Sequence, residues 1–115
     1  MADKNYKAQK EVFTVDANQL GTHPFDINLD KTYSRCTRVT LHNRGAHKDF
    51  SVGIRPQIGS EHVDIIPWEE YQLTETHRGL KTDFPVNNNT IIIDTEIDIP
   101  QNSEIKFALV FHLEK

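Results

Sequence analysis

The chain has 115 residues, of which 37% are hydrophobic and 26% are charged, and its formal net charge at pH 7 is −4. A chain of this size buries enough apolar surface to fold as one domain, and the composition is neither that of a disordered protein nor that of a membrane protein. The negative charge disfavours a nucleic-acid groove, which needs a basic stripe, and the single cysteine excludes an intramolecular disulfide.

The N-terminal segment differs in character from the rest of the chain. Residues 1–10 are polar and aperiodic, so they are predicted to form a flexible arm ahead of a single domain at residues 11–115. The start "MADKNYKAQK" lacks the apolar core of a signal peptide, and no apolar run has the length of a membrane span. We therefore expect synthesis in the cytoplasm and no membrane-spanning segment.

Period-two alternation of apolar and polar residues predicts strands along most of the domain. In chain order they are "EVFTVDA", "PFDINLD", "SRCTRVTLHN", "KDFSVGIRP", "HVDIIPW", "EYQLTET", "KTDFPVN", residues 90–99 and residues 104–113. The third and fourth segments are predicted to form a hairpin, because "NRGAH" between them has the glycine and the length of a common hairpin turn. The sequence "PQNS" is predicted to be the turn between the last two strands.

About eight short strands without a helical period indicate an all-β antiparallel sandwich or barrel. We favour a jelly-roll-like sandwich, because eight strands form two facing four-stranded sheets and the irregular middle of the chain suits cross-sheet connections. An immunoglobulin-like sandwich and a small barrel are the alternatives. The chain lacks the pair of cysteines that is usual in an immunoglobulin-like sandwich.

Two groups of side chains are candidates for ion binding. His42 and His47 flank the predicted hairpin turn with Asp49 just beyond, but a transition-metal site needs three or four ligands that converge on one point. The second group is three carboxylates on one face of a predicted strand: Asp94, Glu96 and Asp98. Two of them together with loop carbonyls would suit calcium. Solvated strand faces and strand ends explain both groups more simply, so no metal or cofactor is predicted.

Catalytic motifs are absent from the sequence, which contains no nucleophile elbow, phosphate-binding glycine loop or paired CxxC. No enzymatic activity is therefore predicted. Trp68 and Tyr71, in "IIPWEEYQL", suggest an exposed platform on which a sugar ring would stack. A carbohydrate-binding module is thus the alternative function. The simpler interpretation of Trp68 is that it fills one end of the core.

The last predicted strand is apolar on both of its faces. Ile105, Phe107, Leu109, Phe111 and Leu113 share one face, and Ala108 and Val110 lie on the other. A strand of this kind needs cover on both sides, and either the arm or another subunit would cover the second face. We expect a homo-oligomer or docking on other structural subunits. The predicted interface residues are Ala108, Val110 and Tyr6.

The segments "FSVGIRP", "NNTIIIDTEIDIP" and "EIKFALVFHLEK" resemble, as an overall pattern over residues 11–115, small β-sandwich virion proteins of phages. Such proteins include penton, decoration and fibre-base subunits. The resemblance implies a non-enzymatic capsid or virion component that assembles into a symmetric oligomer. It implies no particular active residues.

Overall fold

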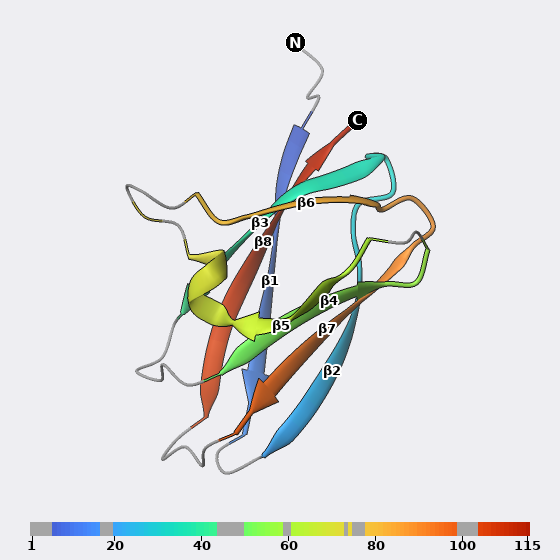
Figure 1. Cartoon of the computed structure of the whole chain (residues 1–115). Coiled ribbons are helices and arrows are strands. Elements are labelled where there is room, and N and C mark those ends of the chain that lie inside the picture. Colours follow the sequence, from blue (N-terminus) through green and yellow to red (C-terminus); the bar gives the residue numbers. More distant parts are fainter. Residues whose placement is uncertain are drawn as a thin grey trace.

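The computed structural model describes residues 6–16, 20–43, 50–58, 61–72, 74, 78–98 and 104–115, which fold almost entirely as strands (Figure 1). The strands are β1 (Tyr6–Val15), β2 (Gly21–Asn28), β3 (Arg35–Asn43), β4 (Ser51–Pro56), β5 (Val63–Pro67), β6 (Leu80–Pro85), β7 (Thr90–Ile97) and β8 (Ile105–Glu114). A short 3-10 helix, η1 (Trp68–Tyr71), follows β5. The predicted all-β class is confirmed. Within these ranges, no helix is long and apolar enough to cross a membrane.

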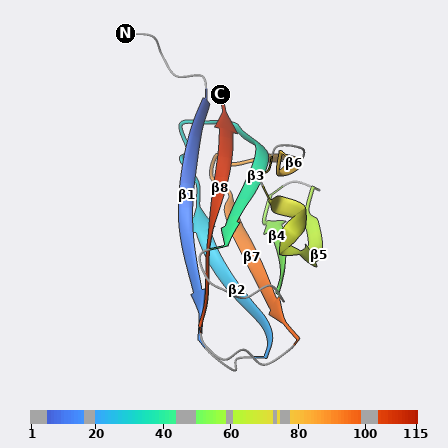
Figure 2. The same cartoon turned by 90° about the vertical axis from the view of Figure 1, so that its left-hand side faces the viewer.

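Two four-stranded antiparallel sheets face each other (Figures 1 and 2). Sheet A has the strand order β1-β8-β3-β6, and sheet B has the order β2-β7-β4-β5. The first strand lies beside the last, the second beside the seventh, the third beside the sixth and the fourth beside the fifth, as in one long hairpin rolled into two layers. This strand order is that of a jelly roll, so the predicted jelly-roll-like sandwich is confirmed.

The core lies between the two sheets and is built from alternate residues of their strands. Ile93, Phe107, Leu109 and Phe111, which the alternation predicts to be buried, are each 0% exposed. The ring of Phe107 lies 5.4 Å from that of Phe13 and 5.1 Å from that of Phe50, measured between centroids. Because Phe13 belongs to sheet A and Phe50 directly precedes β4 of sheet B, these aromatic contacts join the two layers.

The predicted hairpin between the third and fourth segments is wrong, because β3 lies in sheet A and β4 in sheet B. A turn signal is local, whereas β3 lies between the distant strands β8 and β6, and β4 lies between the distant strand β7 and the strand that follows it, β5. The strands β7 and β8 also belong to different sheets, so the chain crosses between the layers there as well. Residues 99–103, which include the predicted "PQNS" turn, lie outside the described residues.

The boundary of the predicted arm at residue 10 is also wrong. Strand β1 begins at Tyr6, and each of its residues pairs with β8, from Tyr6 opposite Glu114 to Val15 opposite Ile105. Pairing at a sheet edge satisfies the backbone of a polar segment without any apolar period. Side chains add to this, since Lys7 binds Asp30 at 2.9 Å. Residues 1–5 of the predicted arm lie outside the described residues.

The predicted strand "EYQLTET" is absent from the part of this segment that the structure describes. Its first residues close η1, and Gln72 makes only an isolated parallel bridge with Leu41. Tyr71 is fully buried at the end of η1, and its hydroxyl donates a hydrogen bond to the carbonyl of Val52 at 2.8 Å. This buried contact draws the chain inward, and it explains why the local alternation does not produce a strand.

Candidate functional site

The outer face of sheet A, which points away from the core, is built from even-numbered residues of β1 and β8 and from their partners on β3 and β6. Strand register arranges these side chains in rows. The rows are Val12, Ala108 and His42, then Lys10, Val110 and Thr40, then Ala8, His112, Arg38 and Lys81. No described strand or helix lies over this face (Figure 2).

The second apolar face predicted for β8 therefore lies at the centre of this surface. Ala108 is only 1% exposed, because its short side chain lies between the larger Val12 and His42 of the same row. Val110 is half-buried, and Val12 is 48% exposed. Tyr6, at the start of β1, is 70% exposed. The structure thus places the predicted interface residues on one face, while their contact with another subunit stays a prediction.

The outer faces of the two sheets carry opposite charge. Exposed cations on the outer face of sheet A are Lys10, Arg35, Arg38, Lys81 and Lys106. The acids on that face are Glu114 and Asp83, and Asp83 is bound by Arg35. On the corresponding face of sheet B, strands β2, β7 and β4 carry three acids and one cation: Asp26, Asp94, Glu96 and Arg55. The first face is therefore positive and the second negative.

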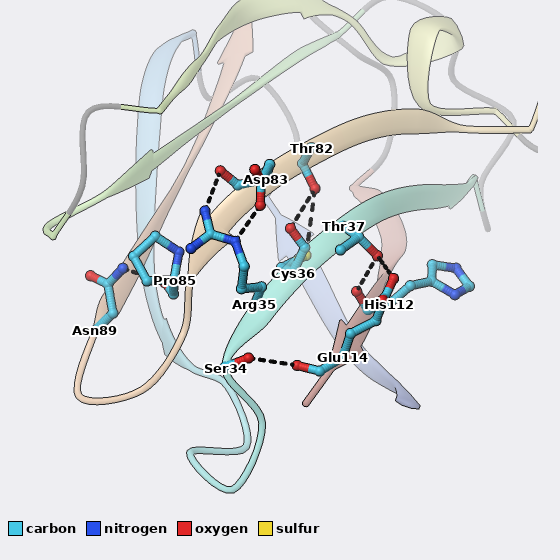
Figure 3. Close-up of polar contacts among 10 residues, drawn as sticks. All are labelled: Ser34, Arg35, Cys36, Thr37, Thr82, Asp83, Pro85, Asn89, His112 and Glu114. Atoms are coloured by element: carbon cyan, nitrogen blue, oxygen red, sulfur yellow. Dashed lines mark hydrogen bonds and ion pairs between the residues drawn. The ribbon is translucent and has the colours of Figure 1, made fainter. Parts of the chain in front are cut away.

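One end of the sheet A face forms a hollow of about 340 Å³. Among its lining residues are Tyr6, Arg38, Lys81, His112 and Glu114. The hydroxyl of Thr37 donates a hydrogen bond to the Glu114 carboxylate at 2.7 Å and also lies near the backbone carbonyl of His112 (Figure 3). The Nε2 atom of His112 is buried and has no hydrogen-bond partner within the described part of the chain. The hollow therefore combines a cationic rim with one unsatisfied ring nitrogen.

Burial lowers the pKa of His112, and the neighbouring Arg38 and His42 lower it further. As the pH falls below about 6.5, the unfolded chain therefore takes up a proton at this position before the folded protein does. The free energy of unfolding should decline in that range, and His112→Gln should remove part of the decline. Urea melts at about pH 7.5 and about pH 5.5 would measure this difference. An equal decline in both proteins would show that another group is responsible.

The structure does not assemble either candidate ion site. His42 is exposed on the sheet A face, while His47 and Asp49 lie outside the described residues. Among the residues that are described, no three histidine, cysteine or acidic side chains converge as metal ligands would. The two carboxylates that follow Asp94 on its face, Glu96 and Asp98, are half-buried and exposed, respectively.

Asp94 itself is an ion-pair residue of sheet B. Its side chain is 7% exposed, and it accepts two hydrogen bonds from Arg55, at 2.5 and 3.0 Å. The interpretation of this strand face as fully solvated is therefore wrong at Asp94. The pair lines a second hollow, of about 520 Å³, in which His62 and Asp64 also approach each other to 3.1 Å. The charged groups of this hollow thus bind one another.

The predicted sugar platform is wrong, because both of its rings are buried. Trp68 is 5% exposed and stacks on Phe50, with centroids 5.9 Å apart and ring planes at 11°. Tyr71 is 0% exposed, and burial raises the pKa of its hydroxyl. The simpler interpretation, that Trp68 fills one end of the core, is confirmed. Cys36 is also buried, which raises the pKa of its thiol to about 11 and keeps it protonated at neutral pH.

The cations of the sheet A face were missed in the sequence. Lys10 belongs to the predicted arm, because Lys10 and Glu11 are both charged and an alternation of apolar and polar residues begins only at Phe13; its place in β1 follows from the pairing with Val110 of β8. Arg38, Lys81 and Lys106 come from separate strands and are neighbours only through the strand order. Comparisons with protein-family models, with curated proteins and with solved structures found no match.

Proposed function

We propose that the protein is a non-enzymatic structural subunit that self-associates through the outer face of sheet A. The observation that carries this proposal is the apolar centre of that face, where the partly exposed Val12 and Val110 flank the buried Ala108 and which no described element covers. Charged side chains surround it. An apolar centre with a polar rim is the usual anatomy of a protein interface.

Charge favours a second copy of the same chain as the partner. Two sheet A faces placed against each other would bring cations together, whereas the acidic outer face of sheet B is complementary to them. The contact would therefore be head to tail, with sheet A of one copy on sheet B of the next. Contacts of this kind generate closed rings or open filaments, which are the forms that shells and fibres use.

A role in a virion is the specific form of this proposal. Jelly rolls are common in viral capsid and lectin domains, but a fold alone does not determine function. The lectin-like alternative depended on Trp68 and Tyr71, whose rings are buried. The open face of sheet A suits a phage capsid, penton, decoration or fibre-base subunit better, because such proteins work through contacts between subunits.

Substitution of Val110 by lysine tests this function. A lysine at the centre of the face would place an unpaired charge in a packed interface and so weaken the contact strongly. Multi-angle light scattering should show an oligomer for the wild type and a mass near the 13.3 kDa of one chain for Val110→Lys. Asn87→Lys is the matched control, since it adds the same charge at an exposed residue of the turn between β6 and β7.

The control protein should assemble like the wild type, and circular dichroism should show that both variants are folded. If the masses of wild type and Val110→Lys are equal, the outer face of sheet A is not an assembly surface.

A further inference from the structure

We propose that the free edge of β1 pairs with the β1 edge of a second copy, in an antiparallel register centred on Gln9, so that two A sheets join into one continuous sheet. This inference rests on the proposed self-association, but it concerns the edge of sheet A and not its outer face. Figure 2 shows β1 along the margin of the molecule, with β8 on one side and no described strand on the other.

Strand β1 is the edge most open to pairing among the four edges of the two sheets. The other edges are β6, β2 and β5. Strands β5 and β6 have only 5 and 6 residues, and each ends in a proline, whereas β2 carries Pro24 within its 8 residues. Proline and short length protect edges, because they remove donors from the exposed ladder. Strand β1 has 10 residues and no proline.

The pairing of β1 with β8 uses the backbone N–H and C=O groups on only one side of β1. Alternate residues of an edge strand direct their N–H and C=O groups away from the sheet, where another strand can bind them. The inner side of β1 is already fixed: the backbone N–H of Asp30 donates to Gln9 Oε1 at 2.9 Å, and Lys7 binds Asp30. The strand is therefore held in an extended form that needs little ordering before a partner binds.

Symmetry restricts the register. Two copies related by a two-fold axis perpendicular to the sheet have antiparallel edges and keep the same face outward. Two residues that lie opposite each other must then both be even-numbered or both be odd-numbered, so that their side chains point to the same face. One residue of β1 therefore lies opposite the same residue of the other copy. If Lys10 is this central residue, the Lys10 side chains of the two copies lie opposite each other, and if Glu11 is central, two carboxylates do. Like charges in direct opposition destabilise a sheet.

A centre at Gln9 avoids both conflicts and pairs complementary side chains. It places Lys7, which binds Asp30 of its own copy, opposite Glu11 of the other copy, so that opposite charges face each other twice on the inner side. On the outer side it places Tyr6 opposite Val12, and these are two of the large exposed hydrophobic residues of the chain, at 70% and 48% exposure. Cross-strand pairs of both kinds stabilise sheets.

Disulfide trapping tests both the edge and the register. Opposed residues of an antiparallel pair have Cα atoms about 4.5–5.5 Å apart, which is within reach of a disulfide. In the proposed register a cysteine at position 6 lies opposite position 12 of the partner, while two cysteines at position 12 lie about 20 Å apart. The buried thiol of Cys36 stays in place in every variant.

Tyr6→Cys and Val12→Cys should each remain mostly monomeric under mild oxidation in dilute solution. Their equimolar mixture should give disulfide-linked dimer as its main product, and so should the double variant Tyr6→Cys/Val12→Cys. Non-reducing gels and intact mass measure the products. Circular dichroism checks that these exposed substitutions leave the fold unchanged.

Equal cross-linking of the single variants and the mixture would overturn the register, and the absence of linked dimer in the mixture would overturn the edge contact itself. These outcomes differ from a failure of the proposed function. If Val110→Lys lowers the mass of the assembly but the mixture does not cross-link, association uses the outer face without the edge. If the mixture cross-links while Val110→Lys leaves the mass unchanged, the edge contact stands and the face contact does not.

Discussion

Replacement of Phe107 by alanine is expected to lower the free energy of unfolding by roughly 3–5 kcal/mol, the usual loss for a core aromatic residue. The side chain is 0% exposed and contacts the rings of Phe13 and Phe50, so its removal leaves a cavity between the two sheets. Urea unfolding followed by the fluorescence of Trp68, the single tryptophan, would measure the loss.

Val110→Ala provides the matched control for Phe107→Ala, because the residue lies on the same strand but on the outer face. Its effect should be smaller, since the side chain is only half-buried. A loss below about 1 kcal/mol in Phe107→Ala would show that the apolar stripe of β8 does not form the core.

Trp68→Ala should have an effect of similar size, a loss of roughly 3–5 kcal/mol. Its indole fills the end of the core beneath η1 and stacks on Phe50, so alanine would leave a large void. Circular dichroism should follow this unfolding, because the variant has no tryptophan. Tyr71→Phe is a milder companion: it keeps the ring but removes the hydrogen bond to Val52, for a loss of about 1 kcal/mol.

The same tryptophan separates the two functions considered for the chain. If Trp68 is a core residue, glycans should not change its fluorescence in the folded protein. Quenching by a glycan, together with a Trp68→Ala variant that folds as stably as the wild type, would instead support a carbohydrate-binding platform.

The sequence predicted the class and architecture of the fold because its strongest signals are local. The alternation over "NNTIIIDTEIDIP" and "EIKFALVFHLEK" determines which side chains of β7 and β8 face the core, and the structure follows it at Ile93 and Phe107. Pairing partners were not predictable in the same way. The "NRGAH" turn suggested a hairpin, but β3 and β4 each pair with strands that lie far away in the sequence.

The candidate site was predictable only in part, for the same reason. Parity along β8 placed Ala108 and Val110 together on one face, as the structure shows. The cations around them come from β1, β3 and β6, and only the order β1-β8-β3-β6 makes them neighbours. The exposure of Trp68 depended on whether a proline-bearing junction would continue as a strand or turn inward as η1, and alternation alone does not distinguish these outcomes.

Sedimentation of the wild-type protein over a wide range of concentrations tests the central claim, self-association of this jelly roll, most directly. The weight-average mass should rise reversibly above the 13.3 kDa of one chain as the concentration increases. Added salt should reduce that rise, because ions screen the attraction between the positive and negative outer faces. A mass that stays at one chain at every concentration, in low and in high salt, would contradict the proposed role as an assembling structural subunit.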